Sequence, residues 1–234
     1  MEIHPGHVTR CGWEAVMLNI ALARRPRGAT LRVLCLGAHS DDIEIGCGGA
    51  ILRLIAEHPG IEVHWVVLAA AGTRKTEAVK SANRFLANAG RSKVVTKSFR
   101  DGYFPYKGAA IKDFFERLKK QVAPDLIFTH YRHDLHQDHR MVSDLTWNTF
   151  RDHLILEYEI VKYDGDLGTP NCFVPLTQGV AREKIRNIVE CFGSQRGRNW
   201  FTAEAFESIL RLRGVESNAP QKLAEAFYCR KMVF

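Results

Sequence analysis

The chain has 234 residues, enough for one sizeable α/β domain with its own core, and its 46% hydrophobic and 25% charged residues are usual for a globular enzyme. The six cysteines are scattered and form no Cys-x-x-Cys pair, which argues against a disulfide framework and against a four-sulfur zinc site. The net charge of +7 favours anionic partners. Because the basic residues are spread along the chain rather than clustered, we interpret them as a basic surface and expect no nucleic-acid partner.

The start of the chain lacks the basic residues and the apolar core of a signal peptide. The longest apolar stretch, residues 63–72, is too short to span a bilayer. Together with the cysteine pattern, these features predict a cytoplasmic protein without a membrane span. We expect residues 1–30 to form an N-terminal extension and residues 31–234 to form one domain. The sequence leaves open whether the chain forms a homo-oligomer.

Apolar strands alternate with helices along most of the chain. We expect strands over residues 31–37, 61–70, 93–97, 125–129 and 154–163. The helices expected after the first four strands cover residues 48–56, 75–88, 112–121 and 139–150. Beyond Pro170 the pattern weakens, and there we expect strands 173–176 and 227–234 and helices 182–191 and 203–212. This alternation predicts a single α/β domain whose mostly parallel sheet is covered by helices on both faces.

Two segments rich in metal-ligand residue types follow strands of the predicted sheet. The first is Ala38-His39-Ser40-Asp41-Asp42-Ile43-Glu44, and the second is His133-Asp134-Leu135-His136-Gln137-Asp138-His139-Arg140. Any one of these residues alone is more typical of a turn, a helix cap or a solvated surface. Ligands of open α/β sheets bind beyond the carboxyl ends of the strands, however, and both segments lie there. A hydrolytic zinc site needs three protein ligands and an open position, which the two segments together can supply.

The glycines after the first strand raise a different interpretation, a dinucleotide-binding turn. Gly46, Gly48 and Gly49 open a helix there, but the Gly-x-Gly-x-x-Gly pattern is absent and no acidic residue ends the second strand. We therefore interpret these glycines as positions where the start of the helix packs closely against the sheet.

The two ligand-rich segments carry a family resemblance. Residues 38–44 resemble the Ala-His-Pro-Asp-Asp-x-Glu signature of the PIG-L/LmbE-like zinc N-deacetylases, with Ser40 in place of the usual proline. His-Gln-Asp-His-Arg at residues 136–140 resembles their second signature, His-x-Asp-His-Arg. Weaker similarities extend the resemblance over roughly residues 31–234. The resemblance implies a single-domain, Rossmann-like α/β fold.

Positions matched to the family imply a metal site and a general base. The resemblance implies that His39, Asp42 and His139 bind one Zn²⁺ per chain, or another divalent transition metal. It also implies that Asp41 is the general base that takes a proton from water. Zinc lowers the pKa of bound water to about 7, so a carboxylate can complete its deprotonation.

The resemblance implies further roles around this site. His136 would stabilise the developing oxyanion, and Asp138 would hold and polarise that imidazole. Arg74 and Asp101 would contact sugar hydroxyls. Arg196 and Arg198 lie beside Trp200 and could grip a phosphate, but we interpret their segment as an ordinary basic loop.

The implied reaction is removal of the N-acetyl group from an N-acetylglucosamine-type sugar, with release of acetate. The sugar could belong to a glycan, a glycolipid, a nucleotide-sugar or a natural-product precursor, and the sequence does not distinguish them. A close alternative is an amidase acting on another amide of an amino-sugar conjugate. An alternative from another class is a nucleotide- or nucleic-acid-binding protein, which predicts no metal and salt-sensitive binding.

Overall fold

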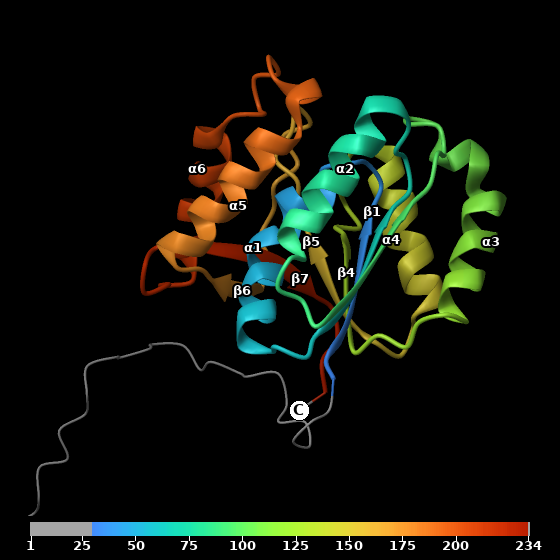
Figure 1. The fold of residues 1–234 in the computed structure, drawn as a ribbon, viewed down its shortest axis with the longest axis horizontal. Coiled ribbons are helices and arrows are strands. Elements are labelled where there is room, and N and C mark those ends of the chain that lie inside the picture. The colour runs from blue at the N-terminus through green and yellow to red at the C-terminus, as the bar shows by residue number, and fades with distance from the viewer. Residues whose placement is uncertain (1–29, 234) are drawn as a thin grey trace, which may run out of the picture.

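A computed structural model describes residues 30–233, so the predicted extension over residues 1–30 lies almost wholly outside the described residues (Figure 1). The strands are β1 (Arg32–Gly37), β2 (Glu62–Val67), β3 (Arg91–Thr96), β4 (Leu126–His130), β5 (Leu154–Tyr158), β6 (Cys172–Pro175) and β7 (Ala224–Cys229). They form one sheet in the order β3-β2-β1-β4-β5-β7-β6. The first five run parallel, while β7 is antiparallel to β5 and to β6. The predicted mostly parallel sheet is confirmed.

Helices cover both faces of this sheet, as predicted. They are α1 (Asp42–Glu57), α2 (Gly72–Phe85), α3 (Gly108–Lys119), α4 (Gln137–Thr149), α5 (Gln178–Cys191) and α6 (Ala203–Glu216), with short 3-10 helices η1 (Phe104–Lys107) and η2 (Gly193–Gln195). Helices α3 and α4 pack on one face, and α1, α2 and α5 on the other. Helix α6 packs beside α5 and β7 (Figure 1). The described residues form a single α/β domain.

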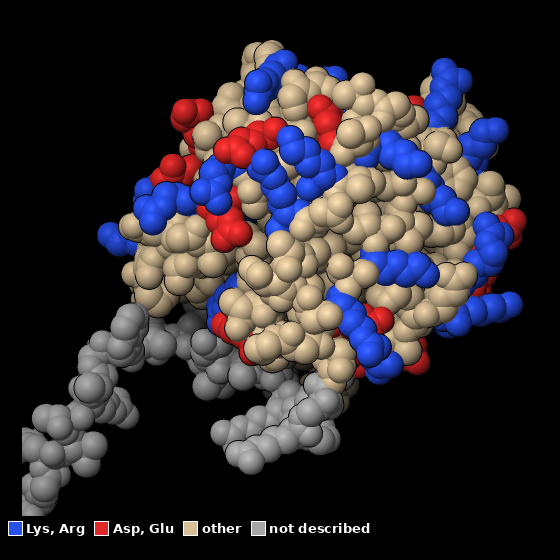
Figure 2. All heavy atoms as spheres, viewed as in Figure 1, with Lys and Arg blue, Asp and Glu red and all other residues tan. Residues whose placement is uncertain are grey.

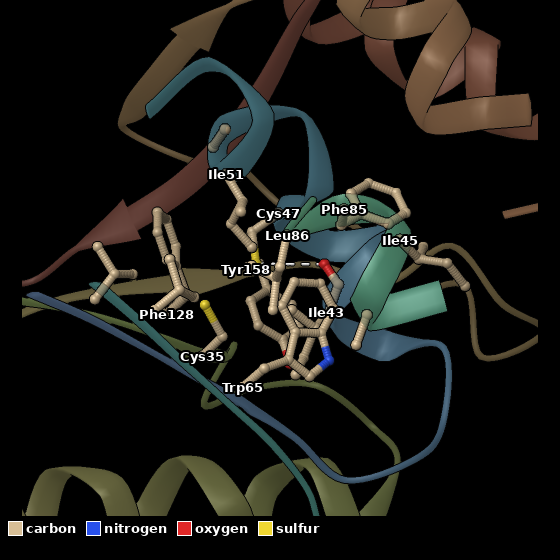
Figure 3. Close-up of a cluster of buried hydrophobic side chains, with 14 of the residues drawn as sticks. Cys35, Ile43, Ile45, Cys47, Ile51, Trp65, Phe85, Leu86, Phe128 and Tyr158 are labelled. Carbon is tan, nitrogen blue, oxygen red and sulfur yellow. Dashed lines mark hydrogen bonds between the residues drawn. The ribbon is translucent and has the colours of Figure 1, made fainter. Parts of the chain in front are cut away.

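Strand β1 shows why the central strands are apolar throughout. Val33 and Cys35 point into the core beneath α1, whereas Leu34 and Leu36 point into the core beneath α3 and α4. Successive side chains of a strand face opposite ways, so a strand covered on both faces needs apolar residues at every position. Figure 3 shows the first of these cores, in which residues of α1 meet Trp65 of β2, Phe128 of β4 and Tyr158 of β5.

Helix α1 begins at Asp42, six residues before the predicted start at residue 48. Its first turns contain glycines, which weaken a helical pattern because glycine is a poor helix former. A side-chain Cβ at Gly46 would lie 2.1 Å from the ring of Tyr158, and one at Gly48 would lie 2.7 Å from Phe85. The close packing expected against the sheet is found at Gly46, whereas Gly48 packs against helix α2 instead, and both glycines lie inside the helix.

Strand β7 was predicted too late in the chain, over residues 227–234. It spans Ala224–Cys229 because its first half pairs with β6. The charged residue Glu225 interrupts the apolar pattern there, yet it is 4% exposed. The Nζ atom of Lys184 donates to Oε1 of Glu225 at 2.5 Å, and the carboxylate also accepts from the backbone N–H groups of Gly49 and Ala50 in α1. A buried carboxylate with these partners is compatible with a strand.

The surface and the helices agree with two expectations from composition. Figure 2 shows lysine and arginine side chains spread over the face in view, with acidic side chains among them. Within residues 30–233, no helix is both long enough and apolar enough to cross a membrane.

Candidate metal and active site

The two ligand-rich segments meet because β1 and β4 are neighbours in the sheet. Parallel neighbours end at the same edge, so the turn into α1 and the turn into α4 lie side by side. The Nδ1 atom of His39 lies 3.1 Å from Nε2 of His139. The carboxylate of Asp42 lies 3.4 Å from the first of these nitrogens and 3.5 Å from the second. Three donor groups that the sequence singled out thus converge on one point.

These three groups have the chemistry and the spacing of a metal site. Zinc binds nitrogen and oxygen donors at about 2.0–2.1 Å, and the corners of such a tetrahedron lie about 3.3 Å apart. The two nitrogens lie 3.1 Å apart, and the Asp42 carboxylate approaches them at similar distances, with Oδ2 at 3.4 Å from Nδ1 of His39 and Oδ1 at 3.5 Å from Nε2 of His139. Two imidazoles and one carboxylate form a set of three protein ligands, as in catalytic rather than structural zinc sites.

The outward nitrogens of the two imidazoles are held by carboxylates. Nε2 of His39 lies 3.0 Å from Asp101 and 3.3 Å from Asp138. Nδ1 of His139 lies 2.9 Å from Asp134. Histidines that bind metals commonly donate their second N–H to a carboxylate, which fixes the tautomer and strengthens the ligand. Each imidazole therefore directs its other nitrogen toward Asp42.

The charged groups at the point of convergence strongly shift one another's pKa values. Burial raises the pKa of Asp42, but the imidazoles of His139, His130 and His39 outweigh burial and hold that pKa well below its usual range. Burial lowers the pKa of His39, and the carboxylates of Asp42, Asp101 and Asp138 more than reverse this effect. Asp42 is consequently ionised at neutral pH, as a metal ligand must be.

Asp41 is adjacent in sequence but has a different environment. Its Oδ1 atom accepts a hydrogen bond from Arg74 at 2.7 Å. Its Oδ2 atom is buried and has no hydrogen-bond partner among residues 30–233. Although Asp41 occupies the N-cap position of α1, its side chain makes no capping hydrogen bond. Burial raises the pKa of Asp41, and the guanidinium of Arg74 opposes that rise. One carboxylate oxygen is thus free to accept a proton.

His136 occupies the N-cap of α4, where its Nδ1 accepts the backbone N–H of Asp138 at 3.2 Å. Burial, and then the charges on His139 and His39, lower the pKa of His136. A neutral ring that accepts at Nδ1 carries its proton on Nε2. The carboxylate of Asp138, expected to hold this ring, accepts instead from the backbone N–H groups of Gly102 and Phe104 and faces His39. Only its backbone joins it to His136.

The two expected sugar contacts lie at the site and already bind protein groups. Arg74 donates to Asp41, Glu77 and Ser194, which joins the turn after β1 to α2 and η2. The Asp101 side chain is 77% exposed and contacts His39.

The site contains two further residues, His130 and Asp134, for which the sequence predicted no role. His130, the last residue of β4, accepts the backbone N–H of Ala38 at 3.0 Å and stacks on His139 with ring centroids 3.9 Å apart. Burial lowers the pKa of His130 to about 4, so the ring is neutral. Asp134 holds His139, and its oxygen lies 3.1 Å from Nζ of Lys162. Asp134 belongs to the second ligand-rich segment, but the sequence does not reveal that it contacts His139 and Lys162, because these contacts depend on tertiary structure.

Comparison with known families agrees with this geometry. The model of the family described as PIG-L, GlcNAc-PI de-N-acetylase, matches residues 34–150, half of the chain. The chain belongs to this family. The matched residues contain most of β1, all of β2 to β4 and α1 to α4, and both ligand-rich segments. The PIG-L resemblance expected from the two signatures is confirmed.

Solved structures with similar folds span several activities. The conserved protein TT1542 from Thermus thermophilus matches with a TM-score of 0.67 and 20% identity, over 87% of this chain and 96% of that one. N,N'-diacetylchitobiose deacetylase from Pyrococcus horikoshii matches with a TM-score of 0.64 and 21% identity, over 84% and 82%. GalB, the 4-carboxy-2-hydroxymuconate hydratase from Pseudomonas putida, matches with a TM-score of 0.62 and 16% identity, over 87% and 98%. At these identities the likeness shows the shared fold, and the reaction must be argued from the site.

Proposed function

We propose that this PIG-L family protein is a zinc-dependent hydrolase that removes the N-acetyl group from an N-acetylglucosamine-type sugar and releases acetate. The observation that carries the proposal is the convergence of His39, Asp42 and His139, with each imidazole backed by a carboxylate. Membership of a family described by de-N-acetylation, and the likeness to a diacetylchitobiose deacetylase, support this choice of reaction.

The chain's own residues supply the proton transfers and the positioning for amide hydrolysis. When bound, zinc supplies Lewis acidity, which polarises a carbonyl and acidifies water. The free Oδ2 atom of Asp41 accepts the proton of the attacking water and passes it to the amine nitrogen as the C–N bond breaks, so that acetate and a free amine leave. The neutral ring of His136 donates from Nε2 to the oxygen that gains negative charge as the amide carbonyl becomes tetrahedral. Asp138 and Asp134 hold the two imidazole ligands in position.

The sugar itself would be recognised beside these groups. Asp101 exposes its carboxylate at the mouth of the site, where it can accept hydrogen bonds from sugar hydroxyls. Arg74 reaches the same region, but its guanidinium is engaged with Asp41 and Glu77. We therefore assign sugar binding to Asp101 and an electrostatic role beside the base to Arg74.

A substrate panel tests the proposed reaction. Metal-loaded protein is incubated with N-acetylglucosamine, diacetylchitobiose and a nucleotide-linked N-acetylglucosamine, and each is analysed by mass spectrometry for loss of an acetyl group. We expect loss of acetyl from at least one sugar, and much slower loss with Asp41→Asn. Amino sugars that carry longer N-acyl groups form the comparison set, because turnover of these alone would indicate an amidase of another specificity and refute deacetylation.

A further inference from the structure

A second hollow lies apart from the candidate active site, between the C-terminal half of α4 and the residues that follow β7. Its volume is about 380 Å³. Four basic side chains line it together with Trp147 and Asp144, and they are Arg132, Arg151, Arg230 and Lys231. None of these residues contributes to the candidate metal site. We refer to this feature as the Trp147 hollow.

Positive charge in the Trp147 hollow exceeds negative charge. Four basic side chains line it, and the acidic groups beside them are Asp144 and the buried Glu157, which leaves a formal charge of +2. The carboxylate of Glu157 is already engaged, since it accepts from Nε1 of Trp147 and from the backbone N–H of Arg132. The carboxylates beside the hollow therefore leave part of its positive charge unneutralised.

The indole of Trp147 holds three of the cations together. The guanidinium carbon of Arg230 lies 4.0 Å from a ring centroid of Trp147, and Arg132 and Lys231 each lie 5.9 Å away. Cation–π attraction of this kind offsets part of the repulsion between like charges. Within residues 30–233, the guanidinium of Arg230 forms no ion pair with a carboxylate. Burial and the nearby Arg132 lower its pKa, which shows that the repulsion persists.

We propose that the Trp147 hollow binds the phosphate group of a phosphorylated ligand. A phosphate monoester carries about −1.5 to −2 charges at neutral pH, which matches the excess of positive charge. Arginine guanidinium groups form paired hydrogen bonds with phosphate oxygens, and three arginines surround the hollow. The same chemistry would bind a soluble phosphate monoester or the headgroup of a phospholipid. This site is independent of deacetylation at the metal.

Titration calorimetry at low ionic strength tests the hollow with defined probes. Inorganic phosphate and glucose 6-phosphate represent soluble ligands, and vesicles of phosphatidylcholine with and without phosphatidic acid represent a lipid headgroup. We expect Arg230→Gln to weaken binding at least about tenfold, the loss expected for one charged hydrogen bond. The matched control is Arg211→Gln, because Arg211 is exposed and lies on α6, where it pairs with Glu207. This control should bind within about twofold of the unmodified protein.

Trp147 gives a second readout that locates the bound anion. Phosphate that enters the hollow should change tryptophan fluorescence, and Trp147→Phe should remove that change. Binding of the soluble probes assigns the site to phosphate monoesters, and binding of phosphatidic acid vesicles alone assigns it to a lipid headgroup, provided that Arg230→Gln weakens either. The proposal is overturned if no probe binds, or if Arg230→Gln binds as tightly as Arg211→Gln, since phosphate would then be held elsewhere, for example at the metal.

Discussion

Two neighbouring aspartates in one turn have opposite electrostatic environments. Three imidazoles surround Asp42 and keep its pKa far below the usual range. Asp41 contacts one cation, Arg74, and its pKa stays raised because burial dominates. A low pKa suits a metal ligand, whereas a general base works best when its pKa approaches the operating pH. The turn after β1 can therefore supply both functions from consecutive residues.

Substituting Asp41 and Asp42 one at a time should separate the effect on catalysis from the effect on metal binding. Asp41→Asn should keep the metal and lower kcat about 10²–10⁴-fold, since an amide cannot accept the proton of water. Asp42→Ala should instead lower metal content, because it removes a ligand. Both variants are compared by elemental analysis and by acetate release. Loss of metal in Asp41→Asn together with retention in Asp42→Ala would mean that the two roles are exchanged.

Substituting Arg74 tests whether this residue contacts the sugar or instead controls the pKa of Asp41. Removing its charge in Arg74→Gln should raise the pKa of Asp41 further, because the cation that opposes burial is lost. Asp41 would then be deprotonated only at higher pH, so the acidic limb of the kcat profile should move to higher pH. Arg84→Gln, which removes an exposed arginine paired with Glu190, is the control. A raised KM with an unchanged kcat profile would instead indicate a sugar contact.

The sequence singled out the three proposed metal ligands, but it did not reveal which residues contact them. His39, Asp42 and His139 belong to compact signatures, so their positions followed from a motif. The contacts of Asp134 and His130 depend on how β4 sits beside β1, and no local spacing reveals that. The carboxylate of Asp138 was expected on His136 and lies against His39, because the backbone of η1 and its flanking turn draws it there.

At the scale of elements, helix α1 joins the site to the core. Its N-terminus carries Asp42, and its apolar side packs in the core shown in Figure 3. The spacing of apolar residues predicted the helix only from residue 48 onward. Its first turns were missed because they contain glycines. Glycine there is required by packing against Tyr158 and Phe85, which no local propensity encodes. Tertiary packing overrides propensity at this position.

Helix α1 also contains a fully buried carboxyl group, Glu44, and this predicts a pH-dependent stability. Burial raises the pKa of Glu44 from 4.5 to about 8. Between these values the folded protein binds a proton that the unfolded chain releases, so the free energy of unfolding should fall as pH rises from about 5 to 8. Glu44→Gln should flatten this dependence and be the more stable form at pH 8. Urea unfolding of chelator-treated protein measures both. Parallel pH profiles for the two proteins would show that Glu44 is not the source.

At the scale of the whole molecule, the last third of the chain supports the part that carries the site. Residues 151–234 lie outside the family match, yet β5, β7 and α5 cover α1 and complete its core. The pattern beyond Pro170 was weak because β6 has only four residues, all of them half-buried, and because a charged residue lies within β7. The buried pair of Lys184 and Glu225 connects this region to α1.

Breaking that buried pair should destabilise the whole domain. Glu225→Ala should lower the free energy of unfolding by about 3–5 kcal/mol, since it leaves the buried ammonium of Lys184 without its counter-charge and removes the carboxylate that accepts from two backbone N–H groups of α1. The double variant Lys184→Met with Glu225→Leu should recover part of the loss, because it removes the unpaired charge. Chemical denaturation of the three proteins gives the comparison. Equal stability of Glu225→Ala and the unmodified protein would show that the pair does not connect these elements energetically.

The proposed function requires that His39, Asp42 and His139 together hold one catalytic metal ion. Elemental analysis of protein purified without chelator, before and after titration with zinc, measures this most directly. We expect one zinc or other divalent transition metal ion per chain in the unmodified protein and in His136→Ala, and little in His39→Ala or His139→Ala. A chain that carries no metal and takes up none on titration, or one that binds metal equally well without His39 and His139, would contradict the account.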